Sequence, residues 1–212
     1  VPCLLLHVDG QVSPTLLNTF GAVDVFRRAF PAPSSGAASA LTPSPQLQIL
    51  VEHADASAPE WQWLQACSAH DSRMQVRVLA GSATEQLLPL MAQAHGWLSL
   101  QRSYAFPSLL GTAQAMGLQV IATASGAALD LQASANLQLV PARQAPIGRG
   151  AFPDAGRFSW NEPDQEAAVA ALQRAVKLPR LSPFSSAGEQ GAQSGRAMRD
   201  RLLQLWTRHR SN

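Results

Sequence analysis

The chain has 212 residues, of which 46% are hydrophobic and 14% are charged, and its formal net charge at pH 7 is +2. This length and composition suit one compact globular domain with a substantial core. The mild basic excess is spread out except near the C-terminus, which argues against nucleic acid as a partner. No apolar run reaches the roughly 18 residues that cross a bilayer, so a transmembrane helix is excluded.

Two cysteines, Cys3 and Cys67, lie near or inside apolar segments without the spacing of a metal site. We expect buried free thiols in preference to a disulfide, and therefore a reducing, cytoplasmic compartment. No Asp-x-Asp-like pair is present to hold a divalent cation against phosphates, so no metal is expected. The chain begins at Val1 without an initiator methionine or a leader, which indicates a piece excised from a longer protein.

Short apolar runs alternate along the chain with segments of helical periodicity. In chain order, the predicted strands are Cys3–Val8, Leu47–Val51, Met74–Ala80, Trp97–Leu100, Val120–Ala122 and Leu137–Val140. The predicted helices are Leu16–Phe30, one through Trp61 and Leu64–Ala69, Glu85–Ala94, Pro107–Met116 ended by Gly117, and Gln165–Val176. The alternation predicts a doubly wound, Rossmann-like α/β fold, with a parallel sheet of about six strands and helices on both faces.

Three further segments interrupt or follow this alternation. Residues 31–45 are rich in Ala, Ser, Gly and Pro and are predicted to form a flexible insertion. Residues 141–164 are predicted to form a long loop, with Phe152, Phe158 and Trp160 as candidate anchors. Residues 180–212 are predicted to close the domain with an amphipathic helix from Gly195 to about Arg208, which leaves residues 1–179 as its main body.

The loop after the fourth predicted strand carries the candidate ligand site. Ligands in parallel α/β sheets bind at the carboxyl ends of strands near helix N-termini, which places Arg102, Ser103 and Tyr104 beside a cleft. The helix start at Phe106 offers amide donors to an anion, although Pro107 lacks an N–H. Arg102 is either a ligand of phosphate or carboxylate or a solvated or salt-bridged surface arginine. Tyr104 either stacks on a base or sugar or plugs the pocket.

The other polar residues form no catalytic constellation, so the catalytic residues are left unassigned. Asp9 follows the first strand and either faces the cleft or caps a loop. Glu162 is expected to cap the amides of the helix that follows it, in preference to a catalytic role. His7 is expected to be a buried, hydrogen-bonded core residue. No pair of histidines has metal spacing, and the sequence has no nucleophile elbow, Walker-type loop or GxGxxG motif after the first strand.

Six segments together carry a family resemblance through their order and spacing. They are VDGQVSPTLLNTFGAVDVFRRAFP, GWLSLQRSYAF, VIATASG, NLQLVPARQAPIG, AFPDAGRFSWNEPD and AMRDRLLQL. They resemble the C-terminal, donor-binding half of a group 1 retaining glycosyltransferase of the GT-B fold. In that family an Arg-Lys pair neutralises the donor diphosphate, and two glutamates eight positions apart contact the donor sugar and the ribose. The resemblance puts the pair at Leu16 and Leu17 and the glutamates at Tyr104 and Thr112, so these motifs are degenerate.

The resemblance implies a nucleoside-diphosphate sugar as substrate, no cofactor, and a separate N-terminal acceptor-binding domain that is absent from this chain. In such a site Arg102, Ser103, Tyr104 and Phe106 would line the diphosphate and sugar region, and Thr112 would approach the ribose. Fixed cations or amide donors must stabilise the charge that develops on the leaving diphosphate, so their loss predicts weakened or lost sugar transfer to a glycan or other acceptor.

Two alternatives to a bacterial-type glycosyltransferase stay open. The first is a noncatalytic glycosyltransferase-like module, a pseudoenzyme retained for binding or scaffolding, which the lost charges favour. The second is an unrelated nucleotide-binding α/β domain, because the fold alone does not fix the function. In either case, apolar surface left by a missing partner domain could drive self-association.

Overall fold

The computed structural model describes residues 1–32, 44–80, 83–104, 108–131, 135–148, 151 and 155–182. The predicted closing helix and most of the predicted insertion lie outside these residues. The main sheet has six parallel strands in the order β3-β2-β1-β4-β5-β6. Its strands are β1 (Cys3–Asp9), β2 (Gln46–Glu52), β3 (Met74–Val78), β4 (Gly96–Ser99), β5 (Gln119–Thr123) and β6 (Leu137–Val140). The predicted α/β class and all six predicted strands are confirmed.

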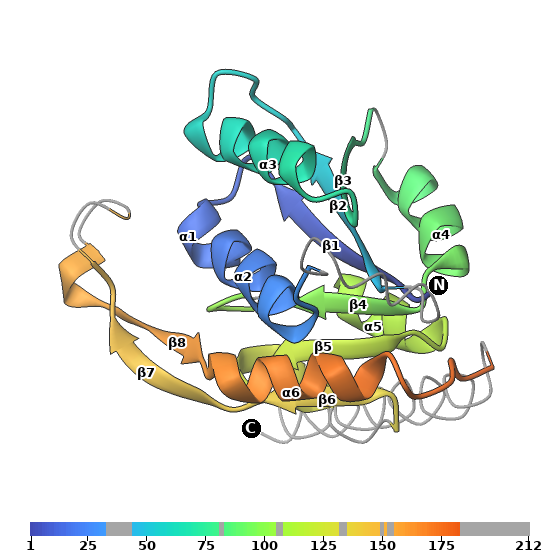
Figure 1. The fold of residues 1–212 in the computed structure, drawn as a ribbon. Coiled ribbons are helices and arrows are strands. Elements are labelled where there is room, and N and C mark those ends of the chain that lie inside the picture. The colour runs from blue at the N-terminus through green and yellow to red at the C-terminus, as the bar shows by residue number, and fades with distance from the viewer. Residues whose placement is uncertain are drawn as a thin grey trace, which may run out of the picture.

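Helices cover both faces of this sheet (Figure 1). They are α1 (Pro14–Leu17), α2 (Thr19–Ala29), α3 (Pro59–His70), α4 (Ala83–Gln93), α5 (Ser108–Ala115) and α6 (Gln165–Ala175), with short 3-10 turns at Gly126–Leu131 and Ala155–Arg157. One apolar core joins the sheet to α2, α3 and α6, and a second joins it to α4 and α5. Because both faces are covered at the centre of the sheet, the central strands are apolar at most positions, as in β1, where Leu4 and Leu6 enter the first core and Leu5 enters the second.

The strand order reverses direction between β1 and β4. From β1 the chain builds outward through β2 and β3, and it then returns to the other side of β1 to build β4, β5 and β6. The adjacent connections after β1 and β4 leave on opposite sides, which opens a crevice at the carboxyl ends of these two strands. This switch point is where a doubly wound sheet usually binds its ligand.

The first predicted helix is broken at Asn18, where one continuous helix Leu16–Phe30 was expected. Asn18 adopts a left-handed backbone with φ of 54°, a conformation that asparagine tolerates better than most residues. Its side-chain Nδ2 donates to the carbonyl of Leu100 at 3.0 Å. Gly21 leaves room for this side chain, because a Cβ there would lie 2.4 Å from Asn18 Oδ1. The break turns α1 toward the end of β4.

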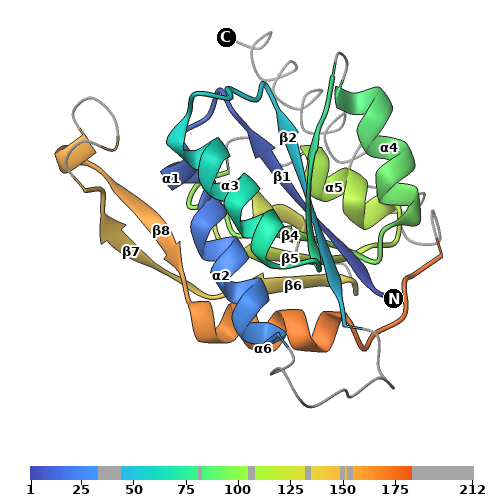
Figure 2. The same ribbon diagram turned by 45° about the horizontal axis from the view of Figure 1, so that its top comes forward.

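The prediction of a long loop at residues 141–164 is wrong for most of the described residues in that range. It contains an antiparallel pair, β7 (Ala142–Pro146) and β8 (Ser159–Pro163), which projects from the main sheet (Figure 2). Its residues are mostly exposed or half-buried, so the pair lacks the buried apolar run that identifies the main strands. Of the predicted anchors, Trp160 contacts Arg102, Phe158 is 57% exposed, and Phe152 lies outside the described residues.

Two local predictions are confirmed and one is corrected. Gly117 ends α5 with φ of 79°, and Cys3 and Cys67 are free thiols, of which Cys67 is buried and Cys3 is half-buried. The cap of α6 is Asp164, whose side chain accepts from the N–H of Ala167 at 2.9 Å. The expected cap, Glu162, pairs with an arginine elsewhere. No helix in the described part of the chain is long and apolar enough to span a membrane.

A half-buried ion pair ties the end of α3 to the end of α2. Asp71 accepts from Arg73 Nε at 2.9 Å and from Nη2 at 2.7 Å, and Arg73 also donates to the carbonyl of Phe30 and lies over the ring of Phe26. The hydrogen bonds from Arg73 outweigh the opposing effect of burial and hold the pKa of Asp71 below its ordinary value. The pair therefore stabilises the fold only while Asp71 is ionised.

We expect Asp71→Asn to lower the free energy of unfolding by about 1–2 kcal/mol near pH 7. A carboxyl whose folded pKa is depressed contributes stability above its unfolded pKa of about 3.9 and loses it as the pH falls through the folded pKa. The difference between the variant and the parent should therefore shrink from about pH 4 downward, measured by urea unfolding over a pH series. Asp130→Asn, at an exposed position, is the control and should show no such trend. A deficit that is constant with pH would exclude the ionic contribution.

Candidate functional site

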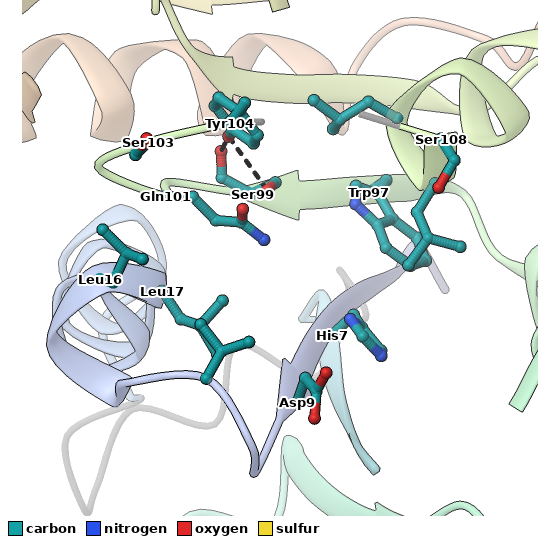
Figure 3. A pocket seen from close by; sticks show the side chains of 13 residues that line it. His7, Asp9, Leu16, Leu17, Trp97, Ser99, Gln101, Ser103, Tyr104 and Ser108 are labelled. Atoms are coloured by element: carbon teal, nitrogen blue, oxygen red, sulfur yellow. Dashed lines mark hydrogen bonds between the residues drawn. The ribbon is translucent and has the colours of Figure 1, made fainter. Parts of the chain in front are cut away.

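A cavity of about 460 Å³ lies at the switch point, between α1 and the carboxyl ends of β1 and β4 (Figure 3). Its position matches the cleft that the sequence predicts beside the loop after β4. The cavity is lined by His7, Asp9, Val12, Leu16, Leu17, Trp97, Ser99, Gln101, Ser103, Tyr104, Ser108, Leu109 and Leu110.

The α1 side of the cavity is formed by Leu16 and Leu17. These are the two positions where the family resemblance puts a diphosphate-binding Arg-Lys pair. The backbone N–H of Arg102 donates to the carbonyl of Leu16 at 2.9 Å, and Asn18 Nδ2 donates to the carbonyl of Leu100. These two hydrogen bonds hold α1 against the loop after β4. The leucine side chains face the space where the resemblance predicts cations.

Arg102 is engaged by other parts of the protein. Its Nε lies 2.6 Å from Glu162 Oε2 and its Nη2 lies 2.8 Å from Oε1, which makes a bidentate ion pair. The guanidinium also donates to the carbonyl of Thr15 and stacks over the ring of Trp160, with its Cζ 4.5 Å from the ring centroid. Its carbonyl accepts from the N–H of Asn161 at 3.1 Å. Arg102 therefore connects α1, the loop after β4 and β8, and it is not among the residues that line the cavity.

The other predicted donor-binding residues lie at different places. Ser103 and Tyr104 line the cavity, whereas Thr112 does not, and its hydroxyl donates to the carbonyl of Ser108 within α5. Phe106 lies outside the described residues. The structure thus brings together two of the five predicted residues, and their role in donor binding stays a prediction.

Tyr104 is 8% exposed and directs its hydroxyl into the protein. The hydroxyl donates to the carbonyl of Ser99 and lies 3.0 Å from Ser99 Oγ. Burial raises the pKa of Tyr104 to about 12, so the phenol stays neutral at physiological pH. The side chain belongs to the second apolar core and borders the cavity, and its hydroxyl is already hydrogen-bonded to Ser99.

Sequence reasoning missed that five lining residues alternate on two neighbouring strands. His7 and Asp9 are two residues apart at the end of β1, and Trp97, Ser99 and Gln101 are two apart on β4 and just after it. Side chains at this spacing share one face of a strand, so the alternation was the available signal. His7 is hydrogen-bonded as expected, through Nε2 to Glu52 Oε1 at 2.7 Å, and stacks on Trp97. It is part-buried and lines the cavity, so its expected place in the buried core is corrected.

The electrostatic character of the cavity is set by Asp9. Its Oδ1 accepts from the N–H of Gln11 at 2.9 Å and lies 2.9 Å from His53 Nδ1, so Asp9 both faces the cleft and organises the loop after β1. Burial raises the pKa of Asp9, but these hydrogen bonds and the charge of nearby histidines outweigh that effect and hold it below its ordinary value. No lysine or arginine is among the described residues that line the cavity. Its ionised lining group is therefore a carboxylate.

Comparison with known proteins defines the class of fold. No family model matches this sequence, and no curated protein sequence is significantly similar to it. Among solved structures, a sucrose-phosphate synthase from Thermosynechococcus elongatus is similar over 98% of this chain and 45% of its own, with a TM-score of 0.56 and 18% identity. An α,α-trehalose-phosphate synthase (UDP-forming) from Burkholderia vietnamiensis is similar over 97% of this chain and 41% of its own, with a TM-score of 0.56 and 12% identity.

A third solved structure is WaaG, described as a glycosyltransferase involved in lipopolysaccharide biosynthesis. It is similar over 84% of this chain and 38% of its own, with a TM-score of 0.54 and 17% identity. The chain thus has a Rossmann-like domain fold found within GT-B glycosyltransferases, which confirms the predicted resemblance at the level of the fold. It spans less than half the length of these three structures.

The described residues offer no evident metal centre. No group of three or more His, Cys, Asp or Glu side chains within this part of the chain is placed to hold a metal ion. Of the lining residues, His7 bonds Glu52, and Asp9 bonds Gln11 and His53.

Proposed function

We propose that this chain is the donor-half domain of a glycosyltransferase-like protein that has lost sugar transfer and serves as a noncatalytic binding module. The observation that carries the proposal is the composition of the switch-point cavity. Leu16 and Leu17 form the side on which the resemblance places two cations, and Arg102 is paired with Glu162 instead of facing the cavity.

The energetics of the reaction support this proposal. Cleavage of a bond to a nucleoside diphosphate develops negative charge on the leaving phosphates, and the loss of one preorganised donor raises such a barrier by about 2.7–4 kcal/mol. Here two cations are replaced by leucines, and the remaining ionised group, Asp9, repels the developing charge. Ser103 and the amides at the start of α5 are neutral donors, which are weaker partners for a diphosphate than an Arg-Lys pair.

Calorimetric titration of the folded chain with uridine, guanosine and adenosine diphosphates and their sugar conjugates tests the proposal. We expect the heat of injection to show no saturation up to about 1 mM ligand. A dissociation constant above this limit corresponds to a binding free energy weaker than about −4 kcal/mol. Micromolar binding of one of these ligands would overturn the proposal and identify the base of a functional donor.

An active donor half is the second candidate, and one observation favours it. The cavity keeps both the place of a donor site in this fold and a volume typical of small-molecule sites. Release of uridine diphosphate from uridine diphosphate glucose, followed by a coupled assay, distinguishes the two. Turnover that is abolished by filling the cavity through Ser103→Trp would support the active enzyme.

A further inference from the structure

We propose that the switch-point cavity binds an uncharged, polyhydroxylated ligand of the size of a mono- or disaccharide, with Asp9 and Gln101 as its main polar contacts. The inference rests on the proposed noncatalytic function, because it assigns a ligand class to the same cavity. It differs from donor binding in that the ligand carries no phosphate.

Two polar side chains in the cavity, Asp9 and Gln101, have hydrogen-bonding groups that other described residues do not use. Both hydrogen bonds that the side chain of Asp9 makes to described residues involve Oδ1, which leaves Oδ2 able to accept from a ligand hydroxyl. Gln101 extends into the open part of the cavity in Figure 3, and its side-chain amide has no hydrogen bond to another described residue. One carboxylate oxygen and one amide thus offer two acceptors and a double donor to a ligand.

The charge of the cavity favours a ligand without phosphate. The lining carboxylate is held ionised at neutral pH by Gln11 and His53, and no lysine or arginine among the described lining residues compensates for its charge. In a partly enclosed site, where charges interact more strongly than in water, this arrangement disfavours phosphorylated ligands. A hydroxyl group, in contrast, gains a charge-assisted hydrogen bond to the carboxylate.

Apolar side chains form much of the remaining lining of the cavity. Leu16 and Leu17 on α1 face Gln101 and the end of β1 across the open space, and Val12, Leu109 and Leu110 add further apolar lining. A sugar ring has C–H faces that pack on such surface and equatorial hydroxyls that reach polar groups at its edge. A site of mostly apolar lining with a few directed polar groups is the usual arrangement for small ligands.

The test compares ligands that share one ring and differ in charge. Glucose, glucose 6-phosphate and glucosamine, followed by galactose, mannose and their disaccharides, are titrated into the ¹⁵N-labelled chain at about pH 7.5, where Asp9 is ionised. We expect at least one uncharged sugar to saturate shifts of the Gln101 and Ser103 amides in the millimolar range. Its 6-phosphate should bind at least tenfold more weakly.

Two variants assign the contacts. Gln101→Ala should weaken binding of the sugar at least fivefold, and Gln62→Ala, at an exposed position on α3, should leave it unchanged. Asp9→Asn keeps the shape of the side chain but removes its charge. The ratio between the dissociation constants of the 6-phosphate and of the parent sugar should therefore fall by at least threefold. Each variant is first shown to have the circular dichroism spectrum of the parent.

Three results would overturn the inference. They are a phosphorylated sugar that binds as tightly as its parent sugar, glucosamine binding more than tenfold tighter than glucose, and no saturation by any uncharged sugar below about 50 mM, where binding is too weak to be specific. If neither an uncharged sugar nor a nucleotide binds, this inference is wrong and the proposed noncatalytic function stands. Micromolar binding of a nucleotide sugar removes the proposed function itself.

Discussion

Replacing Arg102 by Ala is expected to lower the free energy of unfolding by about 2–4 kcal/mol. The side chains of Arg102 and Glu162 are 15% and 21% exposed, so the substitution leaves a largely buried carboxylate without its bidentate partner. It also removes the hydrogen bond to the carbonyl of Thr15 and the stacking on Trp160. Since the pair is not fully buried, the loss should lie below the upper end of the range measured for buried pairs.

Urea unfolding followed by tryptophan fluorescence measures this loss. Arg143→Ala, which removes an exposed arginine of β7, is the matched control and should change stability by less than about 0.5 kcal/mol. Arg102→Lys should recover little, because an ammonium cannot reproduce the planar bidentate geometry. Equal effects of Arg102→Ala and Arg143→Ala would show that Arg102 is not held by Glu162 in solution.

Leu16→Arg is expected to create affinity for a nucleoside diphosphate where the parent has none. Leu16 is half-buried and lines the cavity, so an arginine there can direct its guanidinium into the open space. A unit charge about 4 Å from a phosphate is worth about 4 kcal/mol at an effective dielectric constant of about 20, and desolvation removes part of this gain. We expect uridine diphosphate to bind at least thirtyfold more tightly than to the parent, or about 2 kcal/mol.

Leu16→Gln is the control for this experiment, because it introduces polarity and similar length without charge. It should leave diphosphate binding at the level of the parent. The added affinity of Leu16→Arg should fall with rising salt, since the interaction is ionic and partly exposed to solvent. An arginine variant that is folded and binds no better than Leu16→Gln would contradict the view that charge is what the cavity lacks.

The main sheet could be predicted from sequence because its central strands β1, β4 and β5 are largely buried on both faces, and its outer strands keep short apolar runs. A run such as Leu4–Val8 or Val120–Ala122 has no other stable place in a small domain, so hydrophobicity alone identifies it. The pair β7 and β8 could not be predicted in the same way. Its backbone is paired, but its side chains are largely exposed, and the apolar pattern that marks a strand is missing.

The sequence predicted where the cavity lies in the fold, but it predicted only some of the residues that line it. The rule that ligands bind at the carboxyl ends of parallel strands located the cavity, and Ser103 and Tyr104 line it. The partner of Arg102 is 60 positions away, and it is brought close by a strand pair that the pattern does not indicate. The break at Asn18 was also hidden, because the helical periodicity continues across it and the left-handed turn depends on the contact with Leu100.

The most direct test of the central claim is a titration of the ¹⁵N-labelled chain with uridine diphosphate glucose at low ionic strength, followed at the amides of Gln101 and Ser103. Low salt gives any attraction between a diphosphate and the cavity its largest value. A cavity with a carboxylate and two leucines should show no saturable shifts at these amides up to about 1 mM ligand. Saturable shifts at both amides with a micromolar dissociation constant would contradict the account and restore a working donor site.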